Sequence, residues 1–535
     1  MKAIRFAFSA LCFGLIVYLC LFKVGNSDFW WHVKAGQMLR ESGWISLDPF
    51  AYTRVGEAYL ASHEWLAQVL MSIFYDAGGW GGITIARIVL VLLAFGIPLQ
   101  IHRKNYWPNL LLVVLAVASA RPALTDRPQL FTFAMFSLVL YFCILYIEGD
   151  KKRQRGVLLS LPIITVVWSN LHGAASLIGI TIIGALLCNQ VFTKAKETRW
   201  LLLSFVACGI GLMLTPVGIE NITYLSTLLS DQSHTMIAEW QPSPIGLYLQ
   251  NTIVFWLISI SALLLGRRNL IFSTLTLFGI GYLSTTAARH EALFLLTALA
   301  IAIYQLRFVS LWDNVVKRQA SCVAFSVLFL IVGLYAVAQS HRYTMRDDSF
   351  GLGVFTPLAG ASAFIDQENI TGNMFNNYNA GGELLYHNHK VFLDGRNLDF
   401  GYEYIQRAVD AGTDLSLWNE LDSEYNFTHA VIYYSLEGDR NPMPYIDMLQ
   451  SNSKWSLQYL DDWSAVYTKD ATRNTYAQIT PRMLYATTMP EEITLGNLRI
   501  LEQEVLRIIE QSPSSKKAPA YIKEILEAFG VPAKE

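Results

Sequence analysis

Long apolar runs recur along the first 340 residues, and they constrain the fold more than any other feature of the sequence. A membrane span needs about 17–25 mostly apolar residues, and shorter runs are tolerated inside a bundle. Eleven runs qualify, near residues 4–24, 82–101, 107–121, 128–147, 156–171, 173–192, 200–216, 250–266, 270–287, 290–306 and 319–340. Only 15% of the 535 residues are charged, whereas soluble domains carry roughly 25%. The sequence therefore predicts a polytopic α-helical membrane protein.

Basic residues set the predicted orientation, because Lys and Arg are enriched in cytoplasmic loops. They precede the first run and then fall in alternate loops, at residues 2–5, 102–104, 151–155, 194–199, 267–268 and 317–318. The N-terminus is therefore predicted in the cytoplasm, and the chain beyond about residue 341 outside it. No small-residue cleavage site follows the first run, so we expect a retained anchor. The expected location is a bacterial inner (plasma) membrane, with a periplasmic or extracellular C-terminal region.

A change of composition near residue 341 divides the chain into three predicted parts. Residues 1–340 form a transmembrane domain with a long first outer loop at 25–81, residues 341–489 an extracytoplasmic α/β or α+β domain, and residues 490–535 a terminal helical segment. Strands are predicted for "ELLYH" (383–387), "KVFLDG" (390–395) and "HAVIYYS" (429–435), with a hairpin around Asp461-Asp462. Helices are predicted at 361–368, 401–424, 491–511 and 516–529, the last two as a hairpin that serves as a cap or docking element.

Charged and aromatic residues gather in the loops of the predicted outer face. The residues are Asp28, Trp30, Trp31, His32, His63 and Glu64 in the first loop, Asp126 and Arg127 in the second, His172 in the third, Glu239 in the fourth, and Arg289 and His290 in the fifth. Ionisable groups at membrane depth usually face a bundle interior or a wet cavity. The cytoplasmic loops carry mainly Lys and Arg runs instead, so the outer face is predicted to hold a functional site.

Most of these residues also have a structural interpretation. Asp28 fits the cap of the helix that follows it, and Asp126, which lies before Arg127 and a proline, fits a cap as well. The tryptophans are typical of an interfacial aromatic belt. His172 is compatible with a polar turn, and Arg289 with an anchor to lipid headgroups. The accumulation on one face, rather than any single residue, favours a site.

The order of these features resembles the GT-C class of integral membrane glycosyltransferases. That class includes oligosaccharyltransferase catalytic subunits, protein O-mannosyltransferases and bacterial lipid A aminoarabinose transferases. An aspartate follows the first span, "HEWLAQVLMSIFYDAGGWGGITIARI" ends the long first loop, and "TDRPQLFTFAMF" places a second aspartate before an apolar helix. "YNAGGELLYHNHKVFLDGRNLDFG" also resembles a segment of the extracytoplasmic domain of oligosaccharyltransferase-like bacterial proteins. The acceptor motif "WWDYG" is absent, which weakens the case for transfer to asparagine sequons.

The resemblance implies a polyprenyl-phosphate-linked sugar donor that is used at the outer face. Asp28 matches the first-loop acidic residue, the base or acceptor binder of such enzymes, and Asp126 matches the second-loop acidic residue. Glu239 loosely matches the late-loop glutamate of oligosaccharyltransferases. The expected partners are the lipid-linked sugar, membrane lipids and an extracytoplasmic acceptor, which is a protein, a lipid or a polysaccharide of the cell envelope. No basic patch suggests a nucleic acid.

Sugar transfer from a lipid phosphate needs a carboxylate that takes or orients the acceptor's proton, and cations that stabilise the departing phosphate. Asp28 is the predicted base of an inverting, single-displacement transfer. The predicted roles are catalysis for Asp28, Asp126 and His32, donor phosphate binding for Arg127, Arg289 and His290, and acceptor or sugar binding for Trp30, Trp31, His63, Glu64, His172 and Glu239. Asp28 and Asp126 are also candidate ligands of a divalent cation, Mg or Mn.

Functions of other classes stay open on the sequence alone. The chain fits a non-catalytic scaffold or a transporter in envelope polysaccharide assembly, although transporters often have two similar halves and no such repeat is evident. A multispan acyltransferase with an outer-facing histidine is a third class. The HxxxD and HxxxxD patterns do not occur around His32, His63 or His172, which disfavours it.

Overall fold

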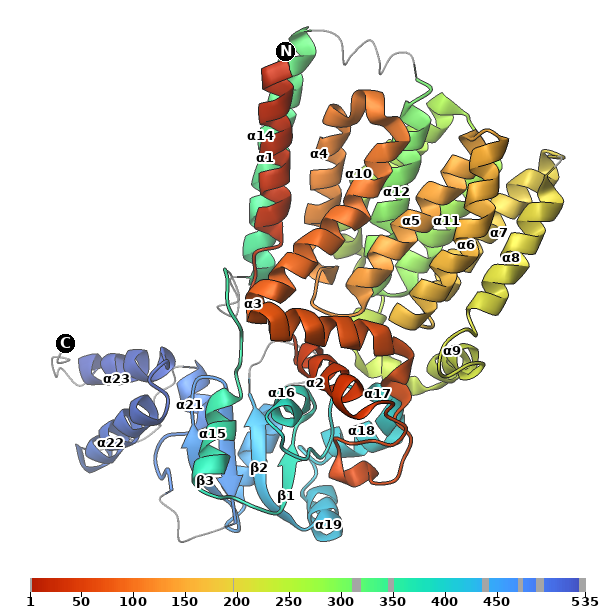
Figure 1. The fold of residues 1–535 in the computed structure, drawn as a ribbon. Coiled ribbons are helices and arrows are strands. Elements are labelled where there is room, and N and C mark those ends of the chain that lie inside the picture. Colours follow the sequence, from red (N-terminus) through yellow and green to blue (C-terminus); the bar gives the residue numbers. More distant parts are fainter. Residues whose placement is uncertain are drawn as a thin grey trace.

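A helical bundle and a C-terminal region with a small sheet lie at opposite ends of the computed structural model (Figure 1). The structure describes residues 2–195, 197–309, 319–344, 351–434, 442–469, 475–486 and 495–528. The N-terminus of α1 lies at the end of the bundle that is far from the C-terminal region (Figure 1). The predicted orientation requires this arrangement.

The bundle has a helix at each predicted span. These helices are α1 (Lys2–Leu19), α3 (Trp65–Gly96), α4 (Tyr106–Ser119), α5 (Gln129–Glu148), α6 (Lys151–Leu171), α7 (Ser176–Phe192), α8 (Thr198–Gly211), α10 (Ile245–Gly266), α11 (Leu270–Thr286), α12 (Glu291–Leu306) and α14 (Gln319–Thr344). In the described part of the chain, three helical stretches are long and apolar enough to cross a membrane, Leu60–Arg103, Gln129–Glu148 and Ile245–Gly266. The other apolar helices are shorter, so the number of spans stays a prediction.

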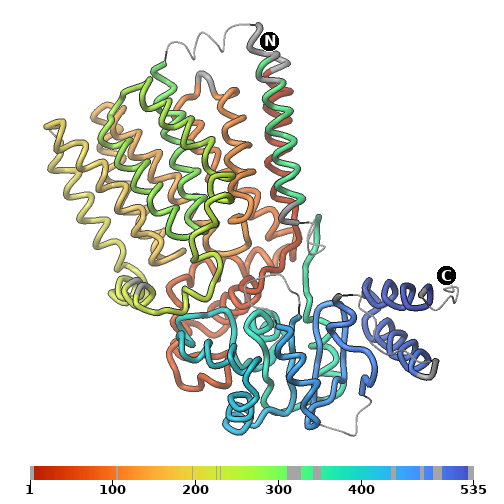
Figure 2. The backbone as a smooth tube through the Cα atoms, turned by 180° about the vertical axis from the view of Figure 1, so that it is seen from behind, coloured from red at the N-terminus to blue at the C-terminus, as the bar shows by residue number. Residues whose placement is uncertain are grey.

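Helix α12 passes through the middle of the bundle, because all residues from Glu291 to Gln305 are buried. A helix that is apolar on every side is stable only where other helices surround it. Helices α1 and α14 instead run side by side along one edge of the bundle (Figures 1 and 2).

The long first outer loop forms a platform between the bundle and the C-terminal region. It contains α2 (Ser27–Ser42), η1 (Tyr52–Arg54), η2 (Leu60–Glu64) and the first half of α3, which lies across the end of the bundle (Figure 1). The positive φ of 53° at Gly79 kinks α3, and its second half then rises into the bundle. A Cβ atom on Gly36 would lie 2.0 Å from the carbonyl oxygen of Gln68, so the glycine lets α2 pack closely on α3.

The C-terminal region has an α+β arrangement. Its sheet has the strand order β1-β2-β4-β3, in which β1 pairs parallel with β2 and the other pairs are antiparallel. The strands are β1 (Asn373–Asn376), β2 (Phe427–Tyr433), β3 (Ser456–Leu460) and β4 (Ser464–Thr468). The helices are α15 (Ala359–Gln367), α16 (Gly381–Tyr386), α17 (Asn397–Phe400), α18 (Tyr402–Asp410), α19 (Leu415–Tyr425), α20 (Met443–Ser451), α21 (Pro481–Ala486), α22 (Leu495–Gln511) and α23 (Lys517–Ala528).

The predicted elements of this region have mixed outcomes. The strand "HAVIYYS" is confirmed as β2, which ends at Tyr433, and Ser435 lies outside the described residues. The hairpin at Asp461-Asp462 and the helix at 361–368 are also confirmed, whereas the helix predicted over 401–424 is divided into α18 and α19. The terminal helices correspond to α22 and α23, although residues 491–494 and 529 lie outside the described residues.

The two strands predicted from "ELLYH" and "KVFLDG" are wrong. "ELLYH" lies mostly in α16, and in "KVFLDG" Val391 forms only an isolated bridge with Ala51. All residues from Gly381 to Leu385 are buried because α16 is wedged against its neighbours, so no alternation of exposed and buried residues marks its conformation.

Candidate functional site

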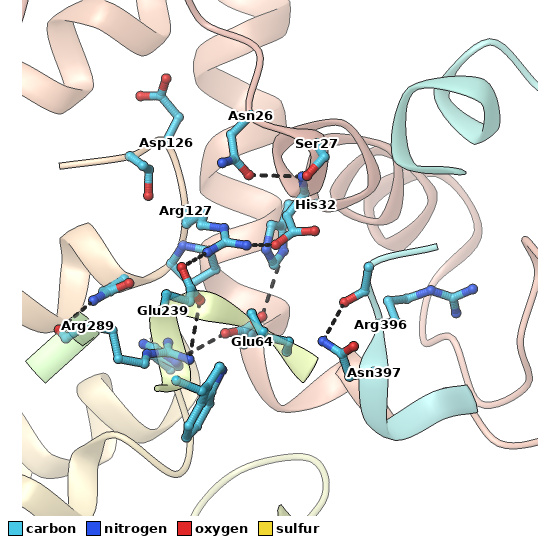
Figure 3. Close-up of a pocket in the computed structure, with 18 of the residues that line it drawn as sticks. Asn26, Ser27, His32, Glu64, Asp126, Arg127, Glu239, Arg289, Arg396 and Asn397 are labelled. Carbon is cyan, nitrogen blue, oxygen red and sulfur yellow. Dashed lines mark hydrogen bonds and ion pairs between the residues drawn. The ribbon is translucent and has the colours of Figure 1, made fainter. Parts of the chain in front are cut away.

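All twelve predicted site residues line one cavity of about 900 Å³. The cavity lies where the loops at one end of the bundle, those predicted to be outer loops, meet the C-terminal region, and its charged groups converge from several elements (Figure 3). These elements are α2, η2, the loop before α5, the end of α6, η6 (Ala238–Trp240) and η7 (Ala288–His290). The predicted accumulation of ionisable residues on one face therefore corresponds to a single site in space.

The N-terminus of α2 directs Asp28 into the cavity. Asn26 is the cap of this helix, because its side-chain oxygen accepts the backbone N–H of Asp28 at 3.0 Å. The interpretation of Asp28 as the cap itself is wrong. Its carboxylate lies in the first turn, where the helix dipole favours a negative charge. One oxygen accepts the indole N–H of Trp31 at 3.3 Å, and the other pairs with Arg127.

A chain of alternating charges crosses the cavity from Asp28 to Arg289. Figure 3 shows its members Arg127, Glu239 and Arg289. Arg127 contacts Asp28 through Nη2 and donates from Nη1 to Oε2 of Glu239 at 2.6 Å. Nη1 of Arg289 lies 3.6 Å from Oε1 of the same glutamate, and its guanidinium lies 4.3 Å from the ring centre of Trp240. Burial raises the pKa of Glu239, but Arg127 and Arg289 outweigh it and hold the pKa below the ordinary value. The glutamate is therefore an anion at neutral pH.

Glu64 has a different environment, formed by three histidines. Its Oε1 lies 3.2 Å from Nε2 of His172 and 3.8 Å from Nε2 of His63, and its Oε2 lies 3.7 Å from Nδ1 of His32. Glu64 ends η2, ahead of the predicted span at 82–101. Burial raises the pKa of Glu64 to about 8, against the opposing charge of Arg289.

The three histidines around Glu64 are neutral at physiological pH. Burial lowers the pKa of His63 to about 4. Burial also lowers the pKa of His32, with a contribution from His63, and that of His172, where the charge of Arg289 acts in the same direction. Within the described residues, no arginine or lysine lies at contact distance from the Glu64 carboxylate, in contrast to the carboxylates of Asp28 and Glu239.

Asp126 lies at the edge of the cavity, and its carboxylate is engaged by Arg87. Nε of Arg87 donates to Oδ1 of Asp126 at 2.7 Å, and a second contact joins Nη2 to Oδ2. Nη1 of Arg87 also donates to the carbonyls of Cys20 and Phe22, both at 2.8 Å. Helix α5 begins at Gln129 with no side-chain cap, so the interpretation of Asp126 as its cap is wrong. The buried pair instead ties the loop before α5 to α3 and to the end of α1.

His290 and Trp30 line the cavity, and their predicted roles stay predictions. Nδ1 of His290 lies 3.2 Å from the carbonyl of Leu283. Trp30 is 2% exposed, and its ring centre lies 4.8 Å from that of Tyr386 in α16 and 6.0 Å from that of Tyr75 in α3. Trp30 thus packs where α2 meets both α3 and the C-terminal region.

The predicted Mg or Mn site does not fit the residues present. Asp28 and Asp126 are each paired with an arginine, so neither carboxylate is left free for a shared cation. Among the described residues, no group of three or more His, Cys, Asp or Glu side chains is placed to hold a metal ion.

The C-terminal region reaches the start of α2 through two glycines outside the predicted site residues, of which Gly395 lines the cavity. A Cβ atom on Gly395 would lie 2.1 Å from Oδ1 of Asp28, and one on Gly382 would lie 2.0 Å from the carbonyl oxygen of Ser27. Both glycines therefore allow the C-terminal region to touch the start of α2. Both glycines lie in the segment "YNAGGELLYHNHKVFLDGRNLDFG". Glycines before and after an apolar run are the only feature of this segment that could have indicated a close contact.

A buried ionic network holds the first loop against the C-terminal region. The guanidinium of Arg396 forms two hydrogen bonds with Asp394, at 2.8 and 2.7 Å, and a third with Asp48 at 2.7 Å. Asp399 lies 3.7 Å from Nη1 of Arg396 and accepts the backbone N–H of Leu60 at 3.0 Å. Because Leu60 begins η2, this network also fixes the position of Glu64.

The fold is similar to that of solved GT-C glycosyltransferases. ArnT from Cupriavidus metallidurans, bound to undecaprenyl phosphate, is 13% identical with a TM-score of 0.56, and the match covers 87% of this chain and 98% of that chain. AglB, an archaeal oligosaccharyltransferase from Archaeoglobus fulgidus in complex with an inhibitory peptide and a dolichol-phosphate, is 10% identical with a TM-score of 0.57, over 100% of this chain and 87% of that chain. The arabinofuranosyltransferase AftD from Mycobacteria is 11% identical with a TM-score of 0.53, over 89% of this chain and 40% of that chain.

No family model and no curated protein sequence matches the chain. At these identities the structural similarities establish the fold alone. The chain therefore has the fold of a GT-C membrane glycosyltransferase, as the resemblance implied.

Proposed function

We propose that this protein transfers a sugar from a polyprenyl-phosphate-linked donor to an extracytoplasmic acceptor. The observation that carries the proposal is the single cavity in which arginines, carboxylates and histidines of five outer loops meet, in a GT-C fold. Two proteins of similar fold have undecaprenyl phosphate or a dolichol-phosphate bound. The acceptor is a protein, a lipid or a polysaccharide, and the proposed location is a bacterial inner membrane with the N-terminus in the cytoplasm.

Arg127 and Arg289 are the proposed ligands of the donor phosphate. A guanidinium binds phosphate oxygens through two parallel hydrogen bonds and keeps its charge at every physiological pH. Both arginines contact Glu239 in the free protein, which holds them on the same side of the cavity. Fixed cations aimed at a departing phosphate stabilise the charge that develops on it in the transition state.

The proposed reaction is a single displacement that inverts the anomeric centre. The acceptor's nucleophilic atom forms a bond to the anomeric carbon, and the bond from that carbon to the phosphate oxygen breaks. Its electron pair leaves with the lipid phosphate. A carboxylate takes or orients the proton that the acceptor loses. Asp28 is the predicted residue for this role, and it lines the cavity within contact distance of Arg127.

The enzyme proposal is tested against the scaffold and transporter alternatives by replacing Asp28 with asparagine in the host cell. We expect sugar transfer to fall by about 10²–10⁴-fold, the usual contribution of a positioned acid or base. The measurement is the composition of the envelope glycans, with membrane levels of the folded protein checked in parallel. Glu220→Gln is the matched control, because Glu220 is exposed in α9 (Glu220–Ser230). Unchanged glycans in cells that contain normal amounts of folded Asp28→Asn protein would contradict the enzyme proposal.

A methyl group at Gly395 is expected to disturb the same carboxylate without removing it. The added Cβ of Gly395→Ala would lie 2.1 Å from Oδ1 of Asp28, so either the carboxylate or the backbone at Gly395 has to move. A displacement of about 1 Å in the groups that position the reactants can lower the rate by about 100-fold. We expect this loss in the turnover of a lipid-linked sugar, while Gly246→Ala, which has open space, keeps wild-type turnover. Full turnover by Gly395→Ala would show that this contact is not needed.

A further inference from the structure

The carboxylates that line the cavity differ in what they contact. Asp28, Asp126, Glu239 and Asp399 each contact an arginine. Glu383 is held inside the C-terminal region, where it accepts the backbone N–H of Leu358 at 3.1 Å. Glu64 alone of this set is surrounded by histidines from three separate elements, and its side chain keeps 11% of its surface exposed.

His172 links Glu64 to helix α5. Its Nδ1 lies 2.8 Å from Oγ1 of Thr132, a hydroxyl that also accepts the indole N–H of Trp168 at 3.0 Å. When the Thr132 hydroxyl donates to Nδ1, the neutral imidazole carries its proton on Nε2, 3.2 Å from Oε1 of Glu64. In that tautomer His172 holds the carboxylate in position.

His32 presents a nitrogen without a hydrogen-bond partner to the cavity beside Glu64. The residue is 3% exposed and lines the cavity, and its Nδ1 has no hydrogen-bond partner in the described part of the chain. That nitrogen lies 3.7 Å from Oε2 of Glu64, which is beyond hydrogen-bond distance. Buried polar groups are normally hydrogen-bonded, so this nitrogen offers a hydrogen-bond position beside the cavity to an ordered water or to a polar group of a bound ligand.

We propose that Glu64 accepts the proton of the acceptor's nucleophilic group, that His172 positions Glu64, and that His32 orients the acceptor. This assignment replaces the base role predicted for Asp28, which instead holds Arg127 for the donor phosphate, so the loss of transfer expected for Asp28→Asn comes from weaker donor binding. The inference rests on the proposed function. As the acceptor's oxygen bonds to the anomeric carbon, its proton passes to Oε2 of Glu64 and the electron pair of the breaking bond leaves on the lipid phosphate. Glu64 later returns the proton to water.

The surroundings of Glu64 predict how its activity depends on pH. The titratable and charged groups that face it from the neighbouring elements are His32, Tyr59, His63, His172, Tyr224 and Arg289. The pKa of Glu64 is raised to about 8 by burial, so the deprotonated form that acts as a base grows as the pH rises through that value. Effective general bases have a pKa near the working pH. We therefore expect turnover to increase as the pH rises through about 8, and this increase is the rising limb of the pH–rate profile.

The first arm of the test needs no substrate. In infrared difference spectra of the full-length protein in detergent, wild type should lose a protonated-carboxyl band with a midpoint at about pH 8. Glu64→Gln should lack this band, and Glu57→Gln, which alters an exposed residue of the same loop, should retain it. A band that is unchanged in Glu64→Gln, or that titrates with an ordinary carboxyl pKa, would overturn the proposal.

The second arm measures turnover and donor binding with undecaprenyl-phosphate-linked sugars. Glu64→Gln should lower kcat by about 100-fold or more, remove the limb near pH 8 and leave donor binding unchanged. Asp28→Asn should weaken donor binding and keep the increase in turnover near pH 8. If that increase persists in Glu64→Gln, the role of Glu64 is overturned and the proposed function is not. If wild type binds and turns over no donor, both the proposed function and the role of Glu64 are overturned.

Discussion

Replacement of Arg127 by methionine is expected to lower the affinity for a polyprenyl phosphate by about 100-fold. A hydrogen bond between charged groups contributes about 1.5–3 kcal/mol, and every 1.4 kcal/mol corresponds to about tenfold in affinity. Arg127 also contacts Asp28 and Glu239. Without its charge, these two carboxylates face the incoming phosphate and repel it, which adds to the loss.

The measurement for Arg127→Met is equilibrium binding of undecaprenyl phosphate to the detergent-solubilised protein. Arg155→Met is the control, because Arg155 is an exposed arginine in α6 and its loss alters the total charge equally. The control should bind like wild type. Equal affinities for wild type and Arg127→Met would show that the phosphate is bound elsewhere.

Replacement of Arg87 by methionine is expected to cause the largest loss of stability. Its side chain is fully buried, and it pairs with Asp126 and satisfies the carbonyls of Cys20 and Phe22. Removal of one partner of a buried ion pair costs about 3–5 kcal/mol, because the other charge is left without compensation. Thermal unfolding followed by circular dichroism should therefore show a marked decrease in Tm, and Arg199→Met, at an exposed arginine, should show none.

A second substitution separates a structural role of Asp126 from a catalytic one. Replacing a buried pair by apolar residues is often neutral for stability, so the double variant Arg87→Met with Asp126→Leu should regain much of the lost Tm. If Asp126 only holds the loop before α5, the double variant should also regain turnover. A stable but inactive double variant would support the predicted catalytic role of Asp126. A wild-type Tm for Arg87→Met alone would contradict the importance of the pair.

The bundle could be predicted because each helix carries its own signal. An apolar run of membrane length is visible in the local sequence, and a helix occurs at every predicted run. The hairpin at Asp461-Asp462 carries a local signal as well. The helix α16 does not, because its buried residues are consecutive and its conformation depends on close packing of Gly381 and Gly382 against distant parts of the chain.

The site could be predicted as a set of residues but not as a set of contacts. Charged groups at the ends of apolar helices are conspicuous, and all of those chosen line the cavity. The partner of each is decided by the tertiary fold: Arg87 lies 39 positions from Asp126 inside a predicted span, and Gly395 belongs to a different part of the chain from Asp28. Sequence spacing therefore identified the charges, whereas the distinction between Asp28 and Glu64 required their surroundings.

A direct test incubates the purified protein with a panel of radiolabelled undecaprenyl-phosphate sugars and an envelope extract that supplies the acceptor, and measures both bound donor and transferred sugar. We expect that at least one donor binds and is turned over by wild type. We also expect that Glu64→Gln binds this donor without turnover and that Arg127→Met binds it poorly. If wild type binds no donor of the panel under conditions in which it is folded, the account is contradicted, and a scaffold or transport function becomes the better explanation of the fold.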